Sequence, residues 1–193
     1  LELDNDIEIN ITKSGSFRGY HPGDYTYPRD RSQIFQVIIG AQLTQNTSWL
    51  QVEKALNNLK DIDALDPVKI TEIGIDELRE AIKPAGYFNQ KSERLKIIAK
   101  WFIDLGSKIP TREELLSIKG VGPETADSIL LYAFKQPSFV IDTYTRRIVG
   151  NLKIIDEKAK YNAIKDIFEQ GLYPDVKIYQ EYHALLVEHA KRY

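Results

Sequence analysis

One carboxylate in this 193-residue chain is placed where it could do chemistry. Asp142 ends an apolar segment and is the only acid between Pro137 and Thr143. A carboxylate in apolar surroundings can stabilise a positive charge that develops beside it, and it can orient or deprotonate a water molecule. Asp142 could equally be an ordinary N-cap of a helix over residues 143–150. The two interpretations are compatible, because a cap would also orient the carboxylate.

A glycine turn about twenty residues earlier could hold an anion. Thr111 and Glu114 predict a capping box for the helix before the turn, and the segment IKGVG (118–122) then ends that helix. Glycines admit positive φ and close backbone approach. The amides of Gly120 and Gly122, at the start of the next helix, would suit one phosphate group. A helical hairpin that merely packs is the alternative.

The elements around these residues are predicted to be helices. Every long periodic segment has the helical period, and we find no alternating strand of useful length and no internal repeat. We therefore expect an all-α protein with about nine or ten helices. Two lobes are predicted: residues 33–135, which contain the glycine turn, and residues 1–32 packed with 136–193. In the last helix, over residues 177–192, we expect these side chains to face inward: Ile178, Tyr182, Leu185, Leu186 and His189.

Composition excludes several classes of function. The chain has no cysteine, so disulfides, thiolate metal sites and cysteine nucleophiles are ruled out. Its formal net charge is −2, so an anionic partner must be met by a local basic patch. The candidates for that patch are Lys91, Arg94, Lys96, Arg146 and Arg147. The apolar runs are too short to cross a bilayer and no leader opens the chain, so we expect a cytoplasmic protein without membrane partners.

The turn and the carboxylate together resemble a known family. IKGVGPETA (118–126) is similar to the helix-hairpin-helix element, a phosphate binder of minor-groove DNA proteins. Followed by FVIDTYTRR (139–147), it resembles the endonuclease III superfamily of base-excision DNA glycosylases. Further similarity lies in LTQNT (43–47), AGYFNQK (85–91) and the last helix from His183. The likeness is greatest to the 3-methyladenine DNA glycosylase branch related to endonuclease III.

This resemblance implies a fold and an activity. We expect a two-lobed helix-hairpin-helix glycosylase fold with the active site in the cleft between the lobes. The partner would be double-stranded DNA with a damaged base, which is flipped out before Asp142 assists hydrolysis of its N-glycosidic bond. Gln45 and Asn46 could fill the hole left by the flipped base, or could cap the corner where they stand. The expected DNA contacts are Lys119, Gly120, Val121, Gly122, Thr125, Gln45 and Asn46.

Position 124 bears on the type of reaction. Bifunctional members of the family carry a lysine there, which forms a Schiff base and cuts the strand. This chain has Glu124, which cannot form an imine, so the resemblance implies a monofunctional enzyme acting on alkylated purines such as 3-methyladenine. On its sequence alone Glu124 is also a favourable first-turn acid. The alternatives are a glycosylase for oxidised or deaminated bases, with or without AP-lyase activity, and a non-catalytic DNA-binding module.

The base pocket and the cofactors are less constrained. Tyr27, Trp49 and Phe88 are candidates to stack on the flipped base, although an apolar helical position makes Trp49 a candidate core residue too. The family implies a monovalent cation on the backbone carbonyls of the hairpin, here those of Leu116, Ile118 and Val121. We expect no other cofactor and no iron–sulfur cluster in this chain. Whether the family's four-cysteine cluster loop follows in a longer protein stays open. The protein is expected to be a monomer, associated with the nucleoid if the source is prokaryotic.

Overall fold

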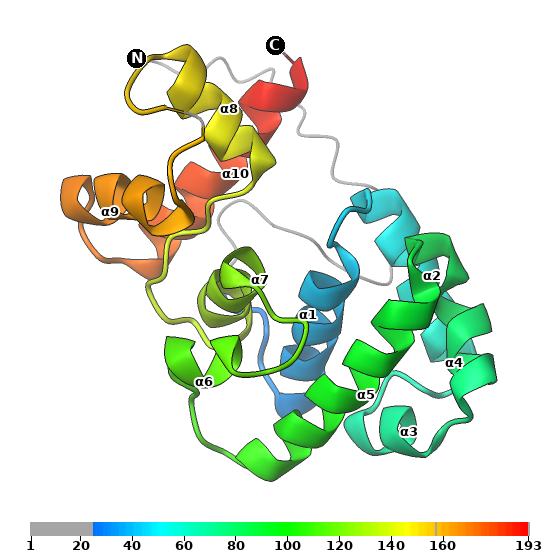
Figure 1. Cartoon of the computed structure of the whole chain (residues 1–193). Helices are drawn as coiled ribbons and strands as arrows, with labels where there is room; N and C mark the ends of the chain where they lie inside the picture. The colour runs from blue at the N-terminus through cyan, green and yellow to red at the C-terminus, as the bar shows by residue number, and fades with distance from the viewer. Residues whose placement is uncertain (1–24, 157, 193) are drawn as a thin grey trace.

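The computed structural model describes residues 25–156 and 158–192, which contain helices and no strand (Figure 1). The predicted all-α class is therefore confirmed. The elements in chain order are α1 (Arg31–Leu43), α2 (Trp49–Asp61), α3 (Pro67–Glu72), α4 (Ile75–Ile82), the 3-10 helix η1 (Lys83–Ala85), α5 (Phe88–Leu105), α6 (Arg112–Leu116), α7 (Pro123–Ser128), the π-helix η2 (Ile129–Ala133), α8 (Thr143–Asn151), α9 (Tyr161–Gly171) and α10 (Val176–Arg192).

Side-chain caps fix where several of these helices begin. The carboxylates of Asp30, Asp66 and Asp142 accept hydrogen bonds from backbone amides in the first turns of α1, α3 and α8. The predicted capping box of α6 is confirmed, because Thr111 and Glu114 each bond the other's backbone amide. Each cap satisfies amides that have no partner within the helix.

The first hydrophobic core lies among α1 to α7, with residues of η1 and η2. In Figure 1, α1 to α5 lie on one side of the molecule, with α6 and α7 beside α1. Phe35 of α1 and Phe102 of α5 are both buried, with ring centroids 5.3 Å apart. Burial of such apolar surface is the main force that holds these helices together.

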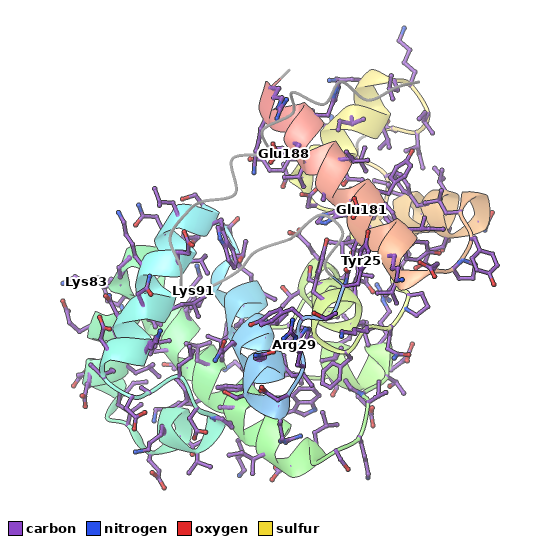
Figure 2. All side chains as sticks on the ribbon, turned by 180° about the vertical axis from the view of Figure 1, so that it is seen from behind. Tyr25, Arg29, Lys83, Lys91, Glu181 and Glu188 are labelled. Atoms are coloured by element: carbon purple, nitrogen blue, oxygen red, sulfur yellow. The ribbon has the colours of Figure 1, made fainter. Side chains whose placement is uncertain are left out.

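A second core joins α8, α9 and α10, which form a separate group in Figure 1. At its centre the rings of Phe139 and Phe168 stack 4.3 Å apart, and Tyr179 meets Phe139 edge-on at 5.3 Å. The described start of the chain also reaches this group, since Tyr25 donates a hydrogen bond to Glu181 of α10; Figure 2 shows the two residues beside each other. Residues 1–24 of the predicted arm lie outside the described residues.

A buried ionic network connects the two groups of helices. Asp127 of α7 is fully buried and accepts two hydrogen bonds from Arg112 of α6, at 2.8 and 3.1 Å. The hydroxyl of Ser138 donates to the same carboxylate at 2.6 Å, and the Lys165 ammonium of α9 lies 3.3 Å away. Lys165 also pairs with Glu169 at 2.6 Å. Because the charges are paired, their burial is tolerated.

Two details of the helices differ from the prediction. In α10 the expected inward face is wrong for Ile178, Tyr182, Leu185 and His189, which are exposed, whereas Leu186 packs partly buried against the second core. Tyr179 and Ala190 are buried instead. The helix is thus rotated relative to the face that its leucines indicate. The helix after the turn, which the helical period predicts to be α-helical, ends in the π-helix η2. None of the described helices is long and apolar enough to span a membrane.

Candidate active site

The predicted hairpin is formed by α6, the turn and α7. The turn is closed by the amide of Val121, which donates to the carbonyl of Ile118 at 3.0 Å. Gly120 has φ +91°, a conformation that other residues rarely adopt. The Arg94 side chain also leaves no room for a larger residue, because a Cβ on Gly120 would lie 2.5 Å from Cδ of Arg94. The glycine is therefore required by both its backbone and its neighbour.

Gln45 braces this turn from the corner between α1 and α2. Its amide nitrogen donates to the Gly120 carbonyl and to the Thr125 hydroxyl, each at 3.0 Å. Its amide oxygen accepts from the Arg94 guanidinium at 2.8 Å. The structure thus brings together three of the predicted DNA-contact residues. Asn46, with φ +53°, is exposed at the same corner. Of the two corner side chains, Asn46 is the one whose side chain faces solvent.

Several side chains of the predicted basic patch make hydrogen bonds within the protein. Lys119 is exposed, and it lines a hollow of about 270 Å³ with Gln90, Glu93, Arg94 and Ile97. Of the other basic candidates, Lys91 is 2% exposed and its ammonium donates to the Leu43 carbonyl, the Thr47 hydroxyl and the Ala85 carbonyl at 2.7–2.8 Å. The remaining three also donate to backbone carbonyls: Lys96, Arg146 and Arg147. Burial lowers the pKa of Lys91 to about 8, with a smaller contribution from Arg94.

Asp142 is both a helix cap and a site carboxylate. Its Oδ1 accepts a hydrogen bond from the Thr145 amide at 2.7 Å, and Nε2 of His183 lies 3.6 Å from its Oδ2. Its side chain is 15% exposed, so it is enclosed yet still in contact with solvent. Burial alone would raise the pKa of Asp142, but His183 and the Thr145 amide hold it below its ordinary value. The carboxylate therefore stays ionised at neutral pH, as charge stabilisation requires.

His183 and Tyr132 are site residues that the sequence did not indicate. His183 lies on α10 and Tyr132 on η2, and the Tyr132 hydroxyl is 2.7 Å from Nδ1 of His183. The inward positions of α10 recur at helical spacing, from Tyr179 through His183 to Ala190. That spacing could have indicated His183, but the leucines of the helix favoured another face. A π-helix is often found at functional sites, and here it carries the tyrosine.

Glu124, in the first turn of α7, lies within electrostatic range of Asp142. The side chain is exposed, yet partial desolvation by surrounding protein atoms, followed by the charge of Asp142, raises the pKa of Glu124. His183 and Arg146 act in the opposite direction. The site therefore joins groups from α7, η2, α8 and α10, which belong to both groups of helices.

The predicted pocket aromatics lie elsewhere on the first group of helices. Trp49 and Phe88 pack partly buried against the first core, and the Trp49 ring lies 3.7 Å from the position of a Cβ on Gly40. Tyr27 donates a long hydrogen bond of 3.4 Å to Gln36 of α1. Within residues 25–156 and 158–192, no hydrogen bond or ring contact joins these three aromatics to Asp142. Their part in a base pocket stays a prediction.

The described residues contain no cluster of three or more His, Asp or Glu side chains that could bind a metal ion. The predicted cation would instead use backbone carbonyls. One of these, the Ile118 carbonyl, is bonded to the Val121 amide within the turn and retains a second lone pair. The turn is compatible with a carbonyl-bound monovalent cation, which stays a prediction.

A hairpin with a glycine turn, followed by an enclosed aspartate at a helix start, defines a helix-hairpin-helix protein with an enclosed carboxylate at its site. The sequence pattern of the HhH-GPD superfamily of base excision DNA repair proteins matches residues 39–174. The chain belongs to this superfamily. It is accordingly a DNA repair glycosylase, and the expected resemblance to endonuclease III-like enzymes is confirmed.

Individual relatives support the same assignment. A protein of Methanocaldococcus jannaschii assigned to the DNA repair glycosylases is 51% identical over 170 residues, covering 82% of this chain and 77% of that protein. Endonuclease III of Sulfolobus acidocaldarius is 28% identical over 165 residues, covering 82% and 73%. The crystal structure of H. pylori 3-methyladenine DNA glycosylase bound to 1,N6-ethenoadenine matches with a TM-score of 0.72 and 29% identity, covering 86% of this chain and 91% of that one.

Proposed function

We propose that this protein is a monofunctional DNA glycosylase that removes alkylated purines, such as 3-methyladenine, from double-stranded DNA. The observation that carries the proposal is Glu124, a carboxylate beside Asp142 at the position where bifunctional family members have a lysine. A carboxylate cannot form a Schiff base, so water must be the nucleophile. The similarity to the H. pylori 3-methyladenine DNA glycosylase, at 29% identity, supports the choice of substrate class.

The chemistry that we propose follows from the ionised state of Asp142. As the C1′–N bond breaks, its electron pair leaves with the base and positive charge develops on the deoxyribose. The Asp142 carboxylate stabilises that charge. A water oxygen then bonds to C1′, and its proton passes to the carboxylate or to solvent. A purine alkylated at N3 or N7 already carries positive charge, so it departs as a neutral base without a general acid.

The remaining elements have roles in binding. The amides at Gly120 and Gly122 would hold one phosphate, with Lys119 nearby, and Asn46 would enter the duplex where the base has left. Trp49, with Tyr27 and Phe88, is the proposed stacking surface for the base. We further propose that residues 33–135 form one lobe, that the arm with 136–193 forms the other, and that the DNA lies in a cleft between them. The protein would act as a monomer, without an iron–sulfur cluster and with a monovalent cation at the hairpin.

A panel of duplexes tests the substrate class. Each duplex carries one of 3-methyladenine, 7-methylguanine, uracil, thymine glycol or 8-oxoguanine, and the released free base is measured. We expect excision of the two alkylated purines. Excision of only the oxidised or deaminated bases would contradict the proposal. The variant Asp142→Asn should bind the same duplexes, but its excision rate should fall to about a thousandth of the wild-type rate or less. If this variant keeps the wild-type rate, Asp142 has no role in the mechanism.

Borohydride trapping tests the monofunctional reaction. Reduction during turnover should give no covalent adduct between the protein and the DNA, because Glu124 cannot supply an imine. A trapped adduct would contradict this proposal. The variant Glu124→Lys is the positive control, since it restores the amine that a bifunctional enzyme uses. If no member of the lesion panel is excised while the duplex is still bound, the protein is a binding module and the catalytic proposal fails.

A further inference from the structure

We propose that His183 is a positioning residue for Asp142 and that Tyr132 sets which ring nitrogen of His183 carries the proton. This inference rests on the proposed role of Asp142 in base excision. The three side chains come from three elements: Asp142 from the start of α8, His183 from α10 and Tyr132 from η2. The last helix thereby acquires a role in the reaction in addition to its role in packing.

The geometry places His183 between the other two side chains. Nδ1 of His183 is 2.7 Å from the Tyr132 hydroxyl, and Nε2 is 3.6 Å from Oδ2 of Asp142. The His183 side chain is 14% exposed. Nε2 is buried and has no hydrogen-bond partner in the part of the chain that the structure describes. An imidazole nitrogen that is buried, unpartnered and directed at a carboxylate is unusual, since buried polar atoms are nearly always bonded.

Tyr132 decides the protonation of the ring. Burial raises the pKa of the Tyr132 phenol, so the phenol keeps its proton and can donate it to Nδ1. In the neutral imidazole the other nitrogen, Nε2, then carries the hydrogen and directs it at Asp142. The opposite tautomer would place the Nε2 lone pair against a carboxylate, which is repulsive. The doubly protonated ring would also present N–H to Asp142.

The consequence for Asp142 is a carboxylate held at both oxygens. The Thr145 amide already holds Oδ1 at 2.7 Å, which leaves Oδ2 as the atom that can rotate. A movement of about half an ångström would bring Nε2–H of His183 into hydrogen-bond range of Oδ2. With both oxygens bonded, the plane of the carboxylate is fixed relative to the deoxyribose. A small misplacement of such a group can slow a reaction by about a hundredfold.

Other charged groups surround the imidazole. Asp142 and Glu124 of α7 are acids that interact with His183. Arg146 of α8 is a basic group that interacts with Glu124. Glu181, on the same helix as His183, acts on Tyr132. A change at His183 therefore changes the local balance of charge as well as the hydrogen bond. The test must separate these two effects.

Three variants of the full chain make that separation. His183→Leu removes the donor, and His183→Gln keeps an amide N–H near the position of Nε2. Tyr132→Phe keeps the ring but removes the hydroxyl that fixes the tautomer. Single-turnover release of the alkylated base that the wild type excises is measured against pH, together with duplex affinity and thermal unfolding.

We expect His183→Leu to slow base release by about 10- to 100-fold with unchanged duplex affinity. His183→Gln should recover most of the rate, and Tyr132→Phe should fall between the two. In His183→Leu the acid limb of the pH–rate profile should move to higher pH. Burial raises the pKa of Asp142, and this variant has lost one of the groups that lower it. A rate in His183→Leu equal to that of the wild type, or a slow His183→Gln that unfolds normally, would overturn the proposal.

A readout without activity separates this proposal from the proposed function. The carboxyl of Asp142 is titrated by NMR in the wild type, in the two His183 variants and in Tyr132→Phe. His183→Leu should raise the pKa of Asp142, and His183→Gln should raise it less. An unchanged Asp142 titration would overturn the inference whatever the lesion panel shows. A shifted titration in a protein that excises nothing would uphold the pairing while the excision function fails. If His183→Leu does not fold, the Tyr132→Phe and His183→Gln titrations decide alone.

Discussion

Replacing Gly120 with alanine tests whether the hairpin turn depends on its backbone and on Arg94 at once. The residue has φ +91°, and a non-glycine residue in such a conformation is strained by about 1–2 kcal/mol. The new Cβ would lie 2.5–2.7 Å from three side-chain atoms of Arg94, so Arg94 must move. Movement breaks its 2.8 Å hydrogen bond to Gln45, which contributes about 1–2 kcal/mol for a charged donor that is partly exposed. The expected loss of unfolding free energy is about 2–4 kcal/mol.

Gly122→Ala is a matched control two residues away. Gly122 has φ −94°, and a Cβ there would meet nothing within 4 Å. We expect a change of within about 0.5 kcal/mol, because an alanine fits that backbone and lowers the entropy of the unfolded chain. Both glycines belong to the proposed phosphate site, so the comparison isolates the effect on stability. Two further variants isolate the contribution of the Arg94 side chain. One is the single variant Arg94→Ala, and the other is the double variant that carries both Arg94→Ala and Gly120→Ala.

Denaturant unfolding of the four variants provides the measurement. In the Arg94→Ala background the Gly120→Ala loss should shrink to about 1–2 kcal/mol, the backbone strain alone. Thermal unfolding should show the same order, with the Tm of Gly120→Ala roughly 4–16 °C below that of the wild type for a chain of this size. If Gly120→Ala is as stable as Gly122→Ala, the strain argument is refuted. If the loss is the same with and without Arg94, the contact with Arg94 has no energetic role.

Further predictions concern the buried charges. Asp127→Asn should destabilise the protein by about 3–5 kcal/mol in denaturant unfolding, because the cations paired with a fully buried carboxylate lose that partner; Glu188→Gln, at an exposed ion pair, should change it by under about 1 kcal/mol. Lys91 has a folded pKa of about 8, so between pH 8 and its unfolded value of 10.5 the unfolded chain binds the proton and the folded chain does not. Wild-type stability should therefore rise across that window relative to Lys91→Met, and an equal slope in both would contradict the assignment. The lowered pKa of Asp142 keeps its carboxylate ionised at pH values below the ordinary carboxyl range. Its contributions to stability and to excision should therefore be lost only as the pH falls through that lowered value. An acid limb of the pH–rate profile above the ordinary carboxyl range would contradict this.

The sequence predicted those parts of the fold that short-range rules determine. The capping box at Thr111, the cap at Asp142 and the break at the glycine turn all depend on residues within a few positions of one another. These local signals do not depend on the rest of the structure.

The parts that the sequence did not predict depend on distant contacts. Lys91 has the sequence of a surface lysine, and only the fold shows three oxygens enclosing its ammonium, two of them backbone carbonyls. His183 was hidden because Leu185 favours another face of α10, and the leucine is 53% exposed in the folded chain. The π-helix that carries Tyr132 has no sequence signal. Two of the three oxygens around the Lys91 ammonium, and the tyrosine bonded to His183, lie more than forty positions away in the sequence.

The network around Asp127 ties the hairpin to the segment that leads to Asp142. Asp127 lies in α7, directly after the hairpin turn, and Ser138, which bonds to it, precedes Asp142 by four residues. The proposed phosphate site and the proposed catalytic carboxylate are therefore connected through one buried network, to which Lys165 also bonds. If the hairpin holds a phosphate as proposed, only a nucleotide at one fixed offset along the strand would bring its C1′ to Asp142. The proposal therefore implies that the ionic network sets the spacing between the bound phosphate and the excised nucleotide, without contact to any base.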